Sequence, residues 1–133
     1  MQSVEHIGIA VKDLATSIPI FERLLNSICY KTELVESEQV YTAFLKTGDT
    51  KIELLQSGTR DGVINSFIEK RGEGIHHLAI AVEDIKSEME RLKAAGFELI
   101  NSEPKRGADN KLVCFLHPKT SNGVLIELCQ EIR

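Results

Sequence analysis

Tryptophan is absent from the 133-residue sequence, and proline and cysteine occur only three times each. The cysteines show no C-x-x-C spacing, and Cys114 and Cys129 lie in apolar strand patterns, which favours buried reduced thiols over disulfides. No apolar run approaches about 18 residues and no signal or transit peptide is recognisable, so we expect no membrane span. These absences predict a cytoplasmic protein, or a protein of the mitochondrial matrix if a transit peptide has been removed.

An excess of basic residues is also missing. Sixteen lysines and arginines stand against 20 acidic residues, for a net charge of −4, which argues against nucleic acid or an anionic membrane as a partner. The chain does have 42% hydrophobic residues, enough for a proper core at this length. We therefore expect one domain spanning residues 1–133.

One short stretch occurs twice in the sequence. Residues 4–14 read VEHIGIAVKDL and residues 75–85 read IHHLAIAVEDI, and an offset of 71 places His6 on His77. Both stretches alternate with a period of two, which predicts strands, and each runs into an aspartate suited to cap a helix. One face of each strand carries the histidine beside small residues, and the other carries bulky aliphatic residues. We expect the aliphatic face to pack against a helix and the histidine face to border a cavity.

The predicted elements follow the same order in both halves. After the first strand we expect a helix through residues 18–28 and strands at 30–36, 39–46 and 51–56. After the second copy we expect a helix through residues 89–95 and strands at about 97–101, 111–117 and 123–130, with a mobile-looking loop at 102–110. The chain is thus predicted to be α+β, with two βαβββ modules at about 1–57 and 75–133 joined by a connector at 58–74.

The repeat continues beyond the first strand. Phe44-Leu45 matches Phe115-Leu116 at the same offset, and KIELLQ at 51–56 matches LIELCQ at 125–130. Four potential metal ligands therefore stand at equivalent positions: His6, Glu53, His77 and Glu127. Imidazole nitrogen and carboxylate oxygen suit divalent ions such as Co, Ni, Zn, Mn or Fe. Four protein ligands in an octahedral site leave two positions for a chelating substrate.

The remaining polar residues of interest have simpler interpretations. His76 points away from the face that carries His77, so we expect a structural role for it. His117 precedes a proline at a strand end and has no repeat partner, which predicts a surface or loop-packing residue. A basic cluster consists of Lys105, Arg106, Lys111 and Lys119. Solvated surface is its ordinary interpretation, and a phosphate-bearing ligand is the alternative.

These residues resemble the vicinal oxygen chelate superfamily and, within it, the methylmalonyl-CoA epimerases. The resemblance runs end to end and is most specific in FLHPK at 115–119 and GVLIEL at 123–128. It implies that the two modules form a cup-like, incompletely closed mixed sheet with the helices outside. It also implies one divalent ion (Co, or Ni, Zn or Mn) bound by His6, Glu53, His77 and Glu127, a CoA thioester as substrate, and a homodimer.

The reaction implied by the resemblance interconverts the C2 epimers of methylmalonyl-CoA by removing and returning the C2 proton through a metal-stabilised enolate. Epimerisation needs two acid/base groups, or one group and a water, and Glu127 and Glu53 are the candidates. Some members of the family carry a glutamate on the second of the three strands, where this chain has Thr42, so the second base stays open.

Three other functions are alternatives to this one. A glyoxalase I-type isomerase (lactoylglutathione lyase) stays open, because it can use the same four ligands. A metal-free module that binds a small molecule fits less well, since such modules typically lack the ligand set. A dioxygenase with two histidines and one carboxylate has no use for Glu53 as a fourth ligand.

Overall fold

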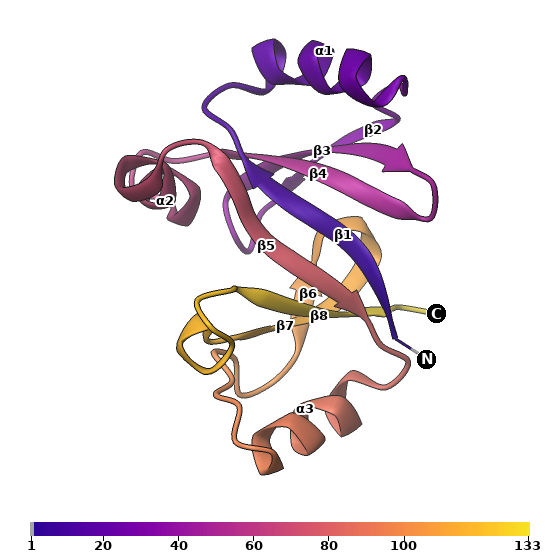
Figure 1. Ribbon diagram of the computed structural model, residues 1–133, viewed down its shortest axis with the longest axis vertical. Helices are drawn as coiled ribbons and strands as arrows, with labels where there is room; N and C mark the ends of the chain where they lie inside the picture. The colour runs from indigo at the N-terminus through magenta and orange to yellow at the C-terminus, as the bar shows by residue number, and fades with distance from the viewer. Residues whose placement is uncertain (1) are drawn as a thin grey trace. The chain divides into compact units, whose positions relative to one another are not determined.

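The two similar stretches of sequence become strands β1 (Ser3–Ala10) and β5 (Gly74–Ala81) of a computed structural model that describes residues 2–133 (Figure 1). The chain divides into two compact units. The first unit is His6–His76, and the second is His77–Arg133 together with residues 2–5. Each unit carries one copy of the β-α-β-β-β order, so the predicted α+β class and its repetition are confirmed.

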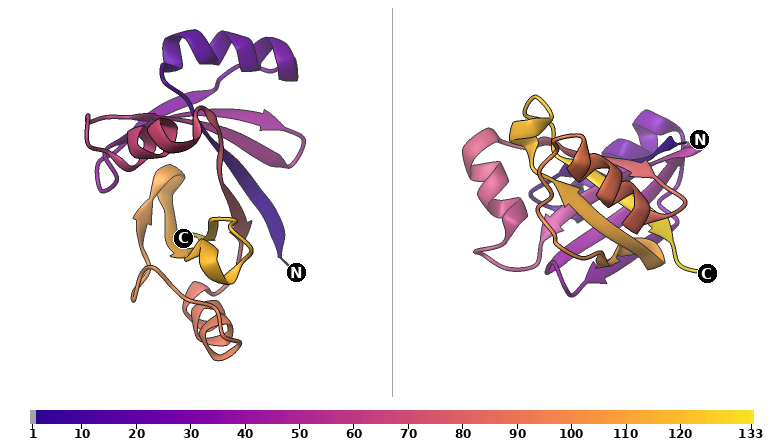
Figure 2. Two further views of the ribbon diagram at one scale, coloured as in Figure 1. Left: turned by 60° about the vertical axis from the view of Figure 1, so that its left-hand side comes forward. Right: turned by 90° about the horizontal axis from the view of Figure 1, so that it is seen from below.

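The first unit contains α1 (Leu14–Leu25), β2 (Lys31–Val35), β3 (Val40–Thr47), β4 (Thr50–Ser57) and α2 (Val63–Arg71). Its strands lie in the order β2-β3-β4-β1, with β1 parallel to β4 and the other pairs antiparallel. Helix α1 covers one face through Ile18, Phe21 and Leu25, which pack against a buried cluster including Leu45 and Leu54 (Figure 2). Helix α2 packs by a separate cluster of Ile64 and Phe67 with Ala10, Val40 and Leu55.

The second unit contains α3 (Ile85–Ala94), β6 (Lys105–Gly107), β7 (Lys111–Leu116) and β8 (Ile126–Glu131), with short 3₁₀ turns at Ala108–Asn110 and Pro118–Thr120. The strand order β5-β8-β7-β6 repeats that of the first unit, with β5 parallel to β8. Buried Ile85, Met89 and Leu92 of α3 pack on Cys114 and Leu128. This burial of aliphatic side chains on one sheet face is the main force holding the helix.

A repeated hydrogen bond ties each helix to its sheet. The side-chain oxygen of Gln56 accepts from the backbone N–H of Leu14, and that of Gln130 accepts from the N–H of Ile85, both at 2.7 Å. The aspartate before each helix also caps it, as the sequence predicts, by accepting from the backbone N–H three residues later. Each glutamine thus satisfies a donor at the helix N-terminus that has no partner inside the helix.

The prediction was wrong in one segment of the second unit. Residues 97–101, predicted as a strand, make only an isolated bridge between Leu99 and Leu116. The strand that ends the sheet order in this unit is instead β6 (Lys105–Gly107), which lies inside the predicted loop. Pairing with β7 determines where the strand forms. Residues 105–107 pair with β7 through the backbone, whereas Asn101 contacts β7 through its side-chain oxygen, which accepts from the N–H of Phe115 at 2.9 Å. Among residues 2–133, no helix is long and apolar enough to cross a membrane.

Candidate functional site

The first unit holds a buried histidine–glutamate pair on one face of its sheet. His6 on β1 and Glu53 on β4 are 4% and 3% exposed, and His6 Nδ1 lies 3.0 Å from Glu53 Oε2. The parallel pairing of β1 with β4 sets this geometry, because Gly8 is the direct partner of Glu53 and leaves space for the two side chains to meet. A buried carboxylate requires such a partner, since an isolated charge in the interior is strongly disfavoured.

The second unit holds an equivalent pair. His77 on β5 and Glu127 on β8 are 6% and 7% exposed, and His77 Nε2 lies 3.0 Å from Glu127 Oε1. Ala79 is the direct strand partner of Glu127, in the place that Gly8 has in the first unit. Phe115 lies opposite Glu127 on β7, and its ring packs edge-on against His77 with centroids 5.7 Å apart. The aromatic ring fixes the imidazole on the same side of the sheet as the carboxylate.

The donors and the spacing in each pair suit a divalent metal ion. Neutral imidazole nitrogen and carboxylate oxygen are ordinary ligands of borderline divalent ions, at bond lengths of about 2.1 Å. Two neighbouring ligands at about 2.1 Å in an octahedral site are about 3.0 Å apart, since the edge is √2 times the bond length. The 3.0 Å separations in both pairs match this edge as well as a hydrogen bond. The histidine and glutamate of each unit therefore fit one half of the ligand set predicted for a divalent metal ion.

His76 faces away from this chemistry, in keeping with its predicted structural role. Its ring packs against Phe67 of α2 with centroids 5.0 Å apart and planes at 80°. Arg71, one turn further along α2, places its guanidinium 5.9 Å from the centre of the same phenyl ring. The contacts of the Phe67 ring with His76 and Arg71 link the end of α2 to the strand that follows it.

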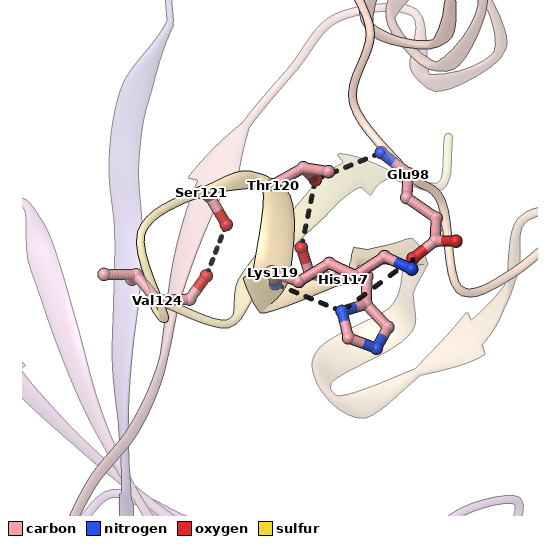
Figure 3. A network of polar contacts seen from close by, with 6 residues as sticks. All are labelled: Glu98, His117, Lys119, Thr120, Ser121 and Val124. Atoms are coloured by element: carbon pink, nitrogen blue, oxygen red, sulfur yellow. Dashed lines mark hydrogen bonds and ion pairs between the residues drawn. The ribbon is translucent and has the colours of Figure 1, made fainter.

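His117 organises the loop after β7 (Figure 3). Its Nδ1 accepts from the backbone N–H of Lys119 at 3.1 Å and lies 3.9 Å from Glu98 Oε2. Lys119 Nζ pairs with the same carboxylate at 3.1 Å, and the Thr120 hydroxyl accepts from the backbone N–H of Glu98. The histidine thus has the loop-packing role that the sequence predicts.

The basic cluster predicted from the sequence has polar partners within the second unit. Lys119 pairs with Glu98, and Lys111 Nζ lies 4.0 Å from Glu131 Oε1. Arg106 donates to the side-chain oxygen of Asn110 at 3.1 Å. The Lys119 side chain is 62% exposed and fits the solvated-surface interpretation, whereas the Lys111 side chain is only 12% exposed. The phosphate-binding alternative stays a prediction.

Two carboxylates of the first unit, Glu33 and Glu38, were not predicted as site residues. Thr42 is 1% exposed, and directly opposite it on β2 lies Glu33, so a carboxylate does occupy the neighbouring strand. Glu38 lies in the turn between β2 and β3, where its Oε1 is shielded from solvent. Strand β3 itself carries no carboxylate, whereas the turn before it contains Glu38. The run ELVESEQV at residues 33–40 contains three glutamates and is acidic enough to have indicated such a residue.

Residues 5–115 match the glyoxalase/bleomycin resistance protein/dioxygenase superfamily. The chain belongs to this superfamily. The matched segment contains three of the four predicted ligands, and the last strand with Glu127 lies beyond it.

Several of the similar proteins are named as epimerases. The chain is 40% identical over 129 residues to an ethylmalonyl-CoA/methylmalonyl-CoA epimerase from Cereibacter sphaeroides, covering 96% of each chain. The crystal structure of methylmalonyl-CoA epimerase from Mycobacterium tuberculosis is similar with a TM-score of 0.93 and 33% identity, over 98% of this chain and 88% of that one. A variant of the Streptomyces coelicolor methylmalonyl-CoA epimerase in complex with 2-nitronate-propionyl-CoA is similar with a TM-score of 0.92 and 30% identity, over 98% and 97%. The resemblance predicted from the sequence is confirmed.

Proposed function

We propose that this protein is an isomerase that interconverts the C2 epimers of methylmalonyl-CoA. The observation that carries the proposal is the occurrence of two buried histidine–glutamate pairs at equivalent places in a duplicated fold. The epimerase relatives, one of them similar in structure and bound to a CoA thioester analogue, support the substrate class. We further propose that it works as a homodimer in the cytoplasm.

We propose that His6, Glu53, His77 and Glu127 together bind one divalent ion, Co or else Ni, Zn or Mn. The donor types and the 3.0 Å spacing within each pair support this ligand set. When bound, the ion would act as a Lewis acid toward the thioester and carboxylate oxygens of the substrate and so make the C2 hydrogen more acidic.

The two glutamates are the proposed acid/base groups. A carboxylate that uses one oxygen as a ligand keeps a second oxygen able to take a proton. Glu53 and Glu127 come from different units, and we assign one carboxylate to each face of the substrate C2 carbon. The proton taken by one carboxylate leaves C2 with the electron pair delocalised onto the thioester carbonyl. A proton delivered by the other carboxylate then completes the inversion. Burial of both groups keeps bulk water away from the reacting carbon.

Exchange of the C2 proton with solvent deuterium tests the proposal. The protein, stripped of metal and reloaded with Co or Mn, should incorporate deuterium at C2 of methylmalonyl-CoA, and the stripped protein should not. Ethylmalonyl-CoA serves as a second substrate. A protein that leaves C2 unexchanged but converts the hemithioacetal of methylglyoxal and glutathione would instead be a glyoxalase.

Replacing each glutamate by glutamine distinguishes metal binding from proton transfer. Glu127→Gln and Glu53→Gln each keep a carbonyl oxygen able to bind metal but remove the group that takes a proton. Each variant should retain metal and lose at least about 100-fold in C2 exchange. Full exchange by Glu53→Gln would restrict that residue to metal binding and require a different second base.

A further inference from the structure

Three lysines of the first unit share the sheet face that carries Glu53, and two of them lie over aromatic rings. Lys31 on β2 lies directly opposite Phe44 on β3, and Phe44 lies directly opposite Glu53 on β4. Directly opposed residues on neighbouring strands point to the same face, and strands are about 4.8 Å apart. Lys31 therefore starts about 10 Å from the candidate catalytic carboxylate, on its side of the sheet.

Two more lysines stand one step along the same face. Lys46 on β3 lies directly opposite Lys51 on β4, and Lys51 lies directly opposite His6 on β1. Each is two residues away from Phe44 or Glu53, so the period-two alternation of a strand puts it on the same side. The hairpin between β3 and β4 thus brings two ammonium groups beside the buried pair of the first unit.

Aromatic rings hold two of these ammonium groups in place. Lys31 Nζ lies 5.1 Å from the centre of the Phe44 ring, and Lys46 Nζ lies 5.5 Å from that of Tyr30. The two rings contact each other with centroids 6.0 Å apart. A cation resting on a ring face keeps its charge and loses side-chain freedom before any ligand arrives. Preorganised charges bind an anion with a smaller entropic cost.

The charge balance of this face favours an anionic ligand. Glu33 pairs with Lys31 at 3.4 Å, and Glu53 pairs with His6. By strand register, three lysines and two carboxylates share this face, and one of the carboxylates, Glu53, is paired with an imidazole. By contrast, the groove along α3 in the second unit is lined by two lysines and three glutamates.

We propose that Lys31, Lys46 and Lys51 form an anion-binding site for the acidic groups of the substrate. The assignment of those groups to a CoA thioester rests on the proposed function. The shared chemistry is an oxyanion, which is either a phosphate of the CoA carrier or the carboxylate of the acyl group. Lysine recognises either one as a point charge.

Binding of methylmalonyl-CoA to the metal-free protein, followed by calorimetry, is the test, because this ligand carries both the phosphates and the carboxylate and its binding needs no turnover. The triple variant Lys31→Gln, Lys46→Gln and Lys51→Gln should bind methylmalonyl-CoA at least about 10-fold more weakly than the parent. A matched control replaces three exposed helical lysines, Lys70, Lys86 and Lys93, by glutamine. The control has the same net charge and should stay within about 2-fold of the parent. Equal weakening in both triple variants, or in neither, overturns the site.

Two further measurements identify the bound anion and test whether the glutamine variant has simply misfolded. Pantetheine thioesters of methylmalonate lack the phosphates, so a lysine-dependent loss that disappears with them assigns the site to phosphate. A loss that persists assigns it to the carboxylate. Replacing the three lysines by arginine keeps the charges and should restore binding. If C2 exchange fails while methylmalonyl-CoA binding depends on these lysines, the proposed function falls and the site stands. If exchange proceeds and the glutamine variant keeps the KM of the parent, the site falls and the proposed function stands.

Discussion

Removal of His77 should abolish metal binding. Its side chain is 6% exposed and lies 3.0 Å from Glu127, so His77→Ala removes one proposed ligand and the imidazole partner of a buried carboxylate. Loss of a group that only orients a ligand costs about 10–100-fold in metal affinity, so loss of a ligand should cost at least about 100-fold. Breaking a buried pair costs about 3 kcal/mol, which lowers the Tm of the metal-free protein by roughly 10 °C at this chain length.

His76→Ala is the matched control, one residue away. It removes an edge-on contact with Phe67, worth about 1 kcal/mol, and should lower Tm by roughly 3 °C. Its metal affinity should equal that of the parent. The assay is titration of the metal-free proteins with Co, read by the visible absorption of the bound ion. Equal Co affinity of both variants would refute the assignment of His77 as a ligand.

Three further outcomes follow from individual contacts. Gln130→Ala should lower the free energy of unfolding by about 1 kcal/mol in urea, because the N–H of Ile85 loses its acceptor. Cys29 should react with a thiol reagent at pH 8 before Cys114, since Cys114 is fully buried and burial raises the pKa of its thiol; simultaneous modification in the folded protein would contradict this. Glu38→Gln should leave C2 exchange unchanged, because Glu53 and Glu127 are the proposed acid/base groups, and a loss of about 100-fold would contradict that assignment.

The repeat made most of the fold predictable. Alternation around His6 and His77 marks two strands, and the aspartates that follow cap two helices as expected. The matching KIELLQ and LIELCQ segments place Glu53 and Glu127 on strands that each pair in parallel with a histidine strand. Local periodicity is sufficient here because each strand has one face covered by a helix.

The segment between α3 and β7 was not predictable in the same way. Residues 102–110 are rich in turn-forming types, and the strand Lys105–Gly107 exists only through its pairing with β7. Gly107 belongs there because an added Cβ would approach Val113 Cγ1 to 2.9 Å. Such a close approach depends on tertiary contacts, as does the partner atom of each histidine, so periodicity gives neither.

The composition of the metal centre tests the central claim most directly. X-ray absorption of the Co-loaded protein, combined with its metal content, gives the number of ions per chain and of imidazoles around each ion. If both histidine–glutamate pairs serve one centre, the protein should bind one ion per chain with two imidazole ligands. Two ions per chain with one imidazole each, or a single ion that persists with one imidazole, would contradict the account.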